Sequence, residues 1–163
     1  MSGDMFLKIG DIKGESVVDG HAGEIEIMSW SWGATQSGST RGISGLTAGK
    51  VNVQDLTFTK LLDTATPNHV GAVCSGQSYP TATLICEKSS GTGKKPVQYL
   101  KIDLKDVLVS SYAVGGSGGS DTHTETITLN FGSVQTSYTP MKSDGTPGAT
   151  IKSGWDVVKG IKL

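Results

Sequence analysis

The sequence is poor in cysteine and proline, and it contains no long apolar run. Its 2 cysteines are not spaced as a CxxC pair, so they form no metal-binding or redox motif. No stretch approaches the roughly 18 apolar residues that a membrane helix requires, so we expect no membrane insertion. The net charge of −1 argues against a nucleic-acid-binding protein, which normally carries a basic surplus.

The first residues lack the features of a secretion signal. Asp4 and Lys8 interrupt the region where a signal peptide would carry an unbroken apolar segment. We therefore expect synthesis in the cytoplasm without a signal peptide, with any export by another route. Because thiols stay reduced in that compartment, we expect Cys74 and Cys86 to be buried and unpaired.

Glycine, in contrast, is abundant. It accounts for 23 of the 163 residues, about twice its usual share of roughly 7%. Glycine, serine and threonine separate short runs in which apolar and polar residues alternate, and a period of two is typical of β-strands. The alternation is clear where Leu100, Ile102 and Leu104 are interleaved with charged residues. The sequence predicts a single, mainly antiparallel all-β domain over residues 1–163.

One short helix is expected to interrupt the strands. Thr66 is a suitable N-cap, and Pro67 fits the first helical position, where its missing N–H costs nothing. Gly76 can end the helix in a left-handed conformation. The residues predicted to form its packed face are Val70, Val73 and Cys74.

The segment of residues 24–32 reads E-I-E-I-M-S-W-S-W and predicts a strand with two different faces. Successive side chains of a strand point to opposite sides, so Trp30 and Trp32 share one face and Ser29 and Ser31 share the other. We expect the tryptophans to belong to the core. The serines would then form a small, uncharged outer wall, which favours a scaffold or conduit over a catalytic site.

Two glycine-rich segments are expected to lie outside regular structure. Residues 33–49 show no periodicity, and loops of this length are often functional or ordered against a partner. Residues 115–119 read G-G-S-G-G, which is typical of a tight turn or a flexible hinge.

No catalytic motif is complete. Residues 115–119 match the G-x-S-x-G nucleophile elbow formally, but that motif needs a helix directly after the serine, and a strand pattern follows here. Gly49 and Lys50 resemble the end of a phosphate-binding loop, but Ser44 and Val51 stand where glycine and Ser/Thr are required. The histidines are isolated in the sequence. We expect no enzyme activity, cofactor or metal.

Several segments, taken in order, resemble one protein family. They are MFLKIGDIKGES, HAGEIEIMSWSWGATQSGS, GKVNVQDLTFTKLLDTATPNH, KDVLVSSYAVGGSGG, TETITLNF and GWDVV, and they cover nearly the whole chain. In these segments the chain resembles the haemolysin-coregulated proteins (Hcp) of the bacterial type VI secretion system. The resemblance implies a two-sheet β-barrel or sandwich with one short flanking helix.

The resemblance also implies a function and a set of partners. Members of the family assemble into homohexameric rings that stack into a hollow tube, inside a contractile sheath and below a VgrG spike. The tube is secreted, and its rings bind or chaperone effector proteins in their lumen. Two alternatives remain: a small ligand-binding β-barrel, enzymatic or not, and a phage tail tube protein of related fold.

Candidate sites follow from this likeness. The residues expected to face the lumen are Ser29, Ser31 and Ser117. The long segment 33–49 is expected to project along the tube axis and contact the next ring. Its candidate contact residues are Gln36, Ser39, Arg41 and Leu46.

Overall fold

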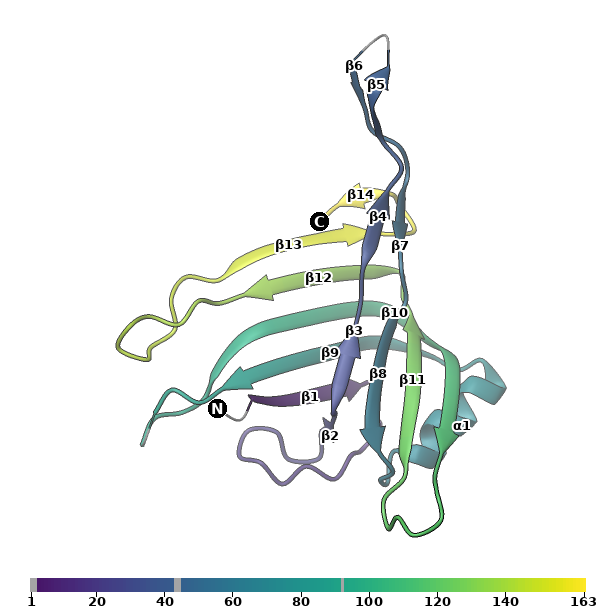
Figure 1. The fold of residues 1–163 in the computed structure, drawn as a ribbon, viewed down its shortest axis with the longest axis vertical. Coiled ribbons are helices and arrows are strands. Elements are labelled where there is room, and N and C mark those ends of the chain that lie inside the picture. The colour runs from purple at the N-terminus through teal and green to yellow at the C-terminus, as the bar shows by residue number, and fades with distance from the viewer. Residues whose placement is uncertain (1–2, 43–44, 92) are drawn as a thin grey trace.

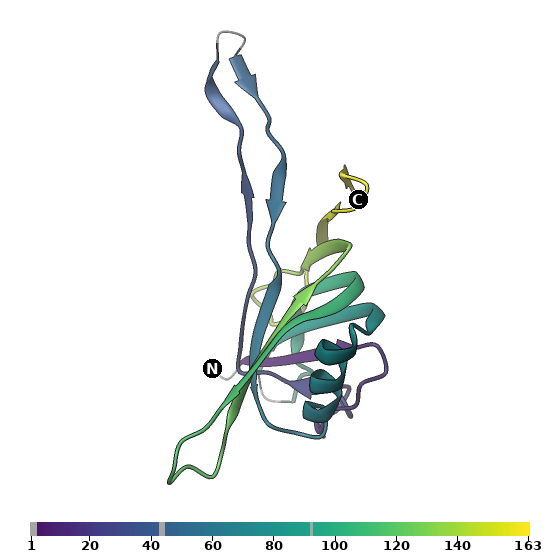
Figure 2. The ribbon, with the colours of Figure 1, turned by 90° about the vertical axis from the view of Figure 1, so that its right-hand side faces the viewer.

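The computed structural model describes residues 3–42, 45–91 and 93–163, and it leaves the side chains of residues 40–47 undescribed. The chain folds into a curved antiparallel sheet with one short helix and one long projecting hairpin (Figures 1 and 2). This confirms the predicted all-β fold with a flanking helix. The strands of the main sheet are β1 (Gly3–Ile9), β2 (Ile25–Glu26), β3 (Ser29–Ser31), β8 (Leu56–Leu61), β9 (Ser78–Lys88), β10 (Val97–Gly115), β11 (Thr124–Asn130), β12 (Ser133–Tyr138), β13 (Ile151–Asp156) and β14 (Ile161–Lys162).

The sheet closes into a barrel because β2 and β3 follow each other in one run of chain. Strands β1, β9, β10, β11, β8 and β3 pair in this order, with β2 pairing on the other side of β1. Between β2 and β3, the N–H of Ile27 donates to Met5 O at 3.1 Å, and the N–H of Met28 donates to Thr59 O at 2.8 Å. The chain thus passes from one sheet edge to the other, and closure removes edges that would otherwise pair with other chains.

Strand β10 bends in its middle, and its two halves pair with different strands. Asp106, at the bend, has a φ of 53°, a conformation that L-residues rarely adopt. Before the bend β10 pairs with β12, and after it β10 pairs with β11. The N–H of Gly132, between these two partners, donates to Lys105 O at 2.8 Å. The bend therefore lets β12, β13 and β14 extend the sheet beyond the barrel (Figure 1).

The barrel interior is a packed apolar core. Leu56 and Phe58 on β8 alternate with polar neighbours, as do Ile127 and Leu129 on β11, and all four are fully buried. Burying each such side chain contributes roughly 1.5–3 kcal/mol to folding. The period-two pattern read from the sequence therefore corresponds to the inward face of the barrel.

His21 holds the loop between β1 and β2 onto the sheet. Its ring stacks on Phe6 at a centroid distance of 4.1 Å, and its nitrogens lie 2.7 Å from Glu24 and 2.5 Å from Glu87. Because carboxylates only accept hydrogen bonds, both nitrogens donate and the ring is positively charged. Burial alone would lower the pKa of His21, but the hydrogen bonds to Glu87 and Glu24 outweigh it and raise that pKa.

Helix α1 (Thr66–Ser75) lies where the sequence predicts it, but it begins and packs differently. The N-cap residue is Ala65, and the hydroxyl of Thr66 instead accepts a hydrogen bond from the N–H of Asp63 at 3.1 Å. Gly76 ends the helix in the left-handed conformation, as predicted. The buried helix residues are His69 and Ala72.

The expected packed face of α1 is therefore wrong in two of its three residues. Val73 is half-buried against the core, whereas Val70 and Cys74 are exposed. The helix is rotated because its first turn is tied to the sheet, which directs His69 edge-on to Phe58 at a centroid distance of 6.1 Å. Of the two cysteines expected to be buried, only Cys86 is.

The segment 33–49 is a hairpin and not the expected irregular loop. Strand β4 (Ala34–Gln36) pairs with β7 (Val51–Val53), and β5 (Ser39–Gly42) pairs with β6 (Gly45–Thr47). This arm projects from the body along the longest axis of the molecule (Figures 1 and 2). Residues 33–49 show no periodicity because β4 is exposed at every position and needs no apolar face, whereas β7 alternates and packs Val53 against the core.

Candidate functional site

The outer surface of one barrel wall carries a patch formed almost entirely by hydroxyl-bearing side chains, here called the hydroxyl face. It is formed by β3, β8, β11 and the second half of β10, whose pairing aligns their residues in rows. Its two rows are Ser29–Thr59–Thr126–Ala113 and Ser31–Thr57–Thr128–Ser111. Between them lies the inward row of Trp30, Phe58, Ile127 and Tyr112.

The hydroxyl face is polar but contains no ionisable group. Ser29 Oγ lies 2.5 Å from Thr59 Oγ1, and Thr57 Oγ1 lies 3.1 Å from Thr128 Oγ1, so neighbouring strands share hydrogen bonds through their side chains. A hydroxyl that is hydrogen-bonded to its neighbour still has lone pairs that can accept hydrogen bonds from water. The face can therefore remain hydrated while presenting neither charge nor a large apolar side chain to a molecule beside it.

The carboxylate at one edge of the hydroxyl face is held by neutral donors. Asn130 Nδ2 donates to Asp55 Oδ1 at 2.8 Å, and Ser110 Oγ donates to Asp55 Oδ2 at 2.9 Å. Both oxygens of Asp55 are thus engaged within the protein. This carboxylate is therefore oriented by its neighbours, and it lies beyond the two hydroxyl rows.

A buried ion pair lies behind the hydroxyl face. Lys60 on β8 and Glu125 on β11 are both 0% exposed, and Lys60 Nζ donates to Glu125 Oε1 at 2.5 Å. Lys60 Nζ also donates to Asp63 Oδ1 at 2.7 Å and to Leu61 O at 2.9 Å, so its three N–H groups are all satisfied. The wall that carries the hydroxyls is therefore cross-linked from inside.

Glu125 connects this pair to β10 and to the helix. Tyr112 Oη donates to Glu125 Oε2 at 2.7 Å, and Thr66 Oγ1 donates to Oε1 at 2.9 Å. Burial alone would raise the pKa of Glu125, but hydrogen bonds from Lys60, Tyr112 and Thr66 outweigh it and lower that pKa. Burial and the bond to Glu125 raise the pKa of Tyr112 to about 12. Burial, reinforced by Lys60, lowers the pKa of His69 to about 4.

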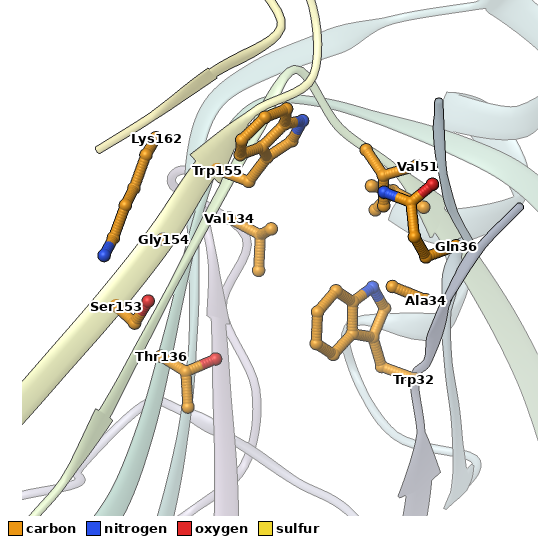
Figure 3. Close-up of a pocket in the computed structure, with 11 residues that line it drawn as sticks. Trp32, Ala34, Gln36, Val51, Val134, Thr136, Ser153, Gly154, Trp155 and Lys162 are labelled. Atoms are coloured by element: carbon orange, nitrogen blue, oxygen red, sulfur yellow. The ribbon is translucent and has the colours of Figure 1, made fainter. Parts of the chain in front are cut away.

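Neither tryptophan of the 24–32 segment lies within the core. Both Trp30 and Trp32 are half-buried and pack against the core from its rim. Trp32 lies at the base of the arm, and its Nε1 is buried without a hydrogen-bond partner among the described residues. It forms one wall of a groove of about 440 Å³, opposite Val134 and Trp155 of the extended sheet (Figure 3).

The remaining predicted residues lie apart from one another. Ser117 is exposed in the loop between β10 and β11, beyond the end of the hydroxyl face. Gln36 and Ser39 are exposed on the arm, in β4 and β5. The side chains of Arg41 and Leu46 lie outside the described residues.

Sequence reasoning found the serines of the hydroxyl face but missed the threonines of its middle strands. Their signal was present in T-F-T at residues 57–59 and in T-I-T at residues 126–128, where hydroxyls alternate with buried apolar residues. What the sequence did not show is the register that places these residues beside Ser29 and Ser31.

The described ranges contain no group of three His, Cys, Asp or Glu side chains that could hold a metal ion. No helix within those ranges is long and apolar enough to cross a membrane.

Comparison with known proteins shows the family of this fold. The family model described as "Type VI secretion system effector, Hcp" matches residues 6–138. The chain belongs to the Hcp family. Within that family, it is 52% identical to the protein hcp1 of Pseudomonas aeruginosa over 163 residues, 99% of each chain.

Solved Hcp structures share the architecture described above. One, described as a type six secretion system protein, superimposes with a TM-score of 0.92 at 31% identity, covering 99% of this chain and all of the other. Hcp1 from Salmonella typhimurium superimposes with a TM-score of 0.78 at 31% identity, covering all of both chains. These two solved structures therefore share the overall fold of this Hcp chain.

Proposed function

We propose that the chain is a structural subunit of the type VI secretion tube, in which homohexameric rings stack and the hydroxyl face lines the bore. Family membership supports a role in type VI secretion. The observation that carries the lumen assignment is the pair of cross-strand rows in which every residue except Ala113 has a hydroxyl and none has a charge.

The chemistry of the hydroxyl face suits a wall along which other proteins move. Exposed apolar patches retain partners, and fixed charges attract or repel them according to their own charge. Short hydroxyl side chains do neither strongly, and they stay hydrated. Effector proteins would therefore contact Ser29 and Ser31 with many weak interactions, which allows loading and release.

The arm is proposed to contact the next ring through Gln36, Ser39, Arg41 and Leu46. In support, it projects along the longest axis of the molecule, away from the barrel (Figure 2). Each of its ladders has only two strands, so each leaves outer backbone donors and acceptors that another chain can pair with.

The other proposed partners follow from the family. A VgrG spike would cap the tube, a contractile sheath would surround it, and lumenal effectors would travel with it. Ser117 is proposed as a further effector contact. We propose that the protein is made in the bacterial cytoplasm without a signal peptide and leaves the cell through the type VI apparatus, as the family's role in secretion supports.

The test is to purify the protein and examine it by native mass spectrometry and negative-stain microscopy. Six-subunit rings with an open centre are the expected result, whereas monomers that retain a small molecule favour a ligand-binding barrel. Loss of export in a strain without the contractile sheath separates a secretion tube from a phage tail tube.

The lumen assignment has its own variant pair. Ser31→Arg places a charged side chain on the hydroxyl face and should leave rings intact while lowering effector retention in a pull-down. Ser31→Thr, which keeps the hydroxyl, is the matched control and should retain effectors like the parent. Equal retention by both variants would contradict the assignment.

A further inference from the structure

Two exposed surfaces that lie far apart on the molecule are complementary in charge and in apolar character. One is a groove of about 270 Å³ at the end where β2 and the last residues of β8 lie, here called the acidic groove. The other is the segment 157–163, V-V-K-G-I-K-L, which includes β14 and is here called the basic hairpin. Figure 1 shows β14 and the C-terminus far from β2 and from the end of β8.

The acidic groove combines apolar side chains with free carboxylates. Met28 is 54% exposed, and Leu61 and Leu62, also exposed, line the groove beside it. Glu15 and Glu26 are exposed at its rim, and neither forms an ion pair with a described residue. The third carboxylate, Asp63, lies 2.7 Å from Lys60, but Lys60 is also paired with Glu125, so this cluster keeps a net negative charge beside the groove.

The basic hairpin also combines exposed apolar side chains with charged ones, but its charge is opposite to that of the acidic groove. Val158 is 80% exposed and Leu163 is 52% exposed, although both are large apolar side chains. Lys159 and Lys162 alternate with them and form no ion pair with described residues. Asp156 is the acidic neighbour, and its Oδ1 accepts the backbone N–H of Lys159 at 2.8 Å. An apolar, lysine-bearing segment left in water in this way needs an acidic, apolar partner surface.

We propose that the basic hairpin of one copy docks in the acidic groove of a second copy, and that this contact joins rings end to end. It rests on the proposed tube function and adds a contact separate from the arm. Because the two surfaces are different and lie far apart, the contact is heterologous and can repeat without closing on itself. Lys159 and Lys162 face Glu15 and Glu26, while Val158 and Leu163 meet Met28, Leu61 and Leu62.

The contact is weak in a single copy and effective in a ring. A hairpin of this size buries far less than the roughly 1,000 Å² expected of a stable interface. A ring presents the contact once per subunit, and simultaneous engagement multiplies the overall affinity by orders of magnitude. Stacking should therefore be reversible by dilution, and it should weaken but persist as salt screens the charged pairs.

Charge reversal with rescue tests this pairing in the full chain. The hairpin variant is Lys159→Glu with Lys162→Glu, and the groove variant is Glu15→Lys with Glu26→Lys. Sedimentation velocity and negative-stain microscopy would measure the fraction of rings in stacks over a concentration series. Each variant should keep its rings and lower the association constant between rings at least tenfold, and the combination of both should restore it.

A matched control reverses two lysines elsewhere. Lys101→Glu with Lys105→Glu changes the net charge as much as the hairpin variant does, on exposed positions of β10, and should stack like the parent. Equal stacking of all variants, or a combined variant no better than its halves, overturns the docking. Parent rings that stay single at every concentration overturn it too but leave the ring proposal intact, whereas a chain that stays monomeric overturns both.

Discussion

Removing the buried ammonium of Lys60 should destabilise the barrel more than any surface change. Lys60 and Glu125 are completely buried, and Lys60→Met leaves the Glu125 carboxylate without its cation. Breaking such a pair on one side costs about 3–5 kcal/mol. Glu125 keeps hydrogen bonds from Tyr112 and Thr66, so we expect a loss of about 3 kcal/mol, the lower end of that range.

The assay is urea unfolding followed by tryptophan fluorescence at one protein concentration, because assembly itself stabilises the fold. The double variant Lys60→Met, Glu125→Gln removes both charges and should recover at least half of the loss, since no unpaired charge remains buried. Lys101→Met is the control: its pair with Asp103 is exposed at 3.8 Å, and its removal should change stability by less than about 0.5 kcal/mol.

The pH dependence gives a second measurement of the same pair. The folded pKa of Glu125 lies below its unfolded value, so its contribution is present above the unfolded pKa of about 4.3. That contribution is lost as the pH falls through the folded pKa. The stability gap between the parent and Lys60→Met should therefore narrow below about pH 4. A stability difference under about 1 kcal/mol between the parent and Lys60→Met at pH 7 would refute the reasoning. A difference that stays the same as the pH is lowered would refute it as well.

Other regions of the chain give three further predictions. The pKa of His21 is higher in the folded state than in the unfolded state, so its stabilising contribution is fully present below the unfolded pKa of about 6.5 and is lost as the pH rises through the folded pKa. The urea midpoint of the parent should therefore fall as the pH rises above about 6.5, and that of His21→Gln should not. Cys74 is exposed and Cys86 is buried, so a thiol reagent should label Cys74 in the native protein and reach Cys86 only after unfolding; labelling of both at equal rates would contradict the packing. Trp30→Ala should cost about 2 kcal/mol in thermal or urea unfolding, less than the roughly 3–5 kcal/mol of a fully buried aromatic, because the side chain is only partly buried.

The sequence alone determined those features that depend on neighbours along the chain. Alternation of apolar and polar residues identified the strands of the barrel, as at Leu100, Ile102 and Leu104, because a strand exposes its faces with a period of two. Pro67 and Gly76 located the helix for an equally local reason, since each sets the backbone conformation at its own position. Ser29 and Ser31 were recognised as an outward pair by the same alternation.

Tertiary structure decided which of these faces meet. The threonines of β8 and β11 join the serines of β3 only because the strands pair in one register, and register joins residues that are far apart in the chain. The face of α1 that packs was likewise set by a bond between Thr66 and Glu125, fifty-nine positions away in sequence, and not by the apolar residues of the helix itself. Residues 33–49 show the limit of periodicity most directly. Their strands are joined by backbone pairing, and β4 is exposed at every position, so the sequence of this segment carries no alternating signal.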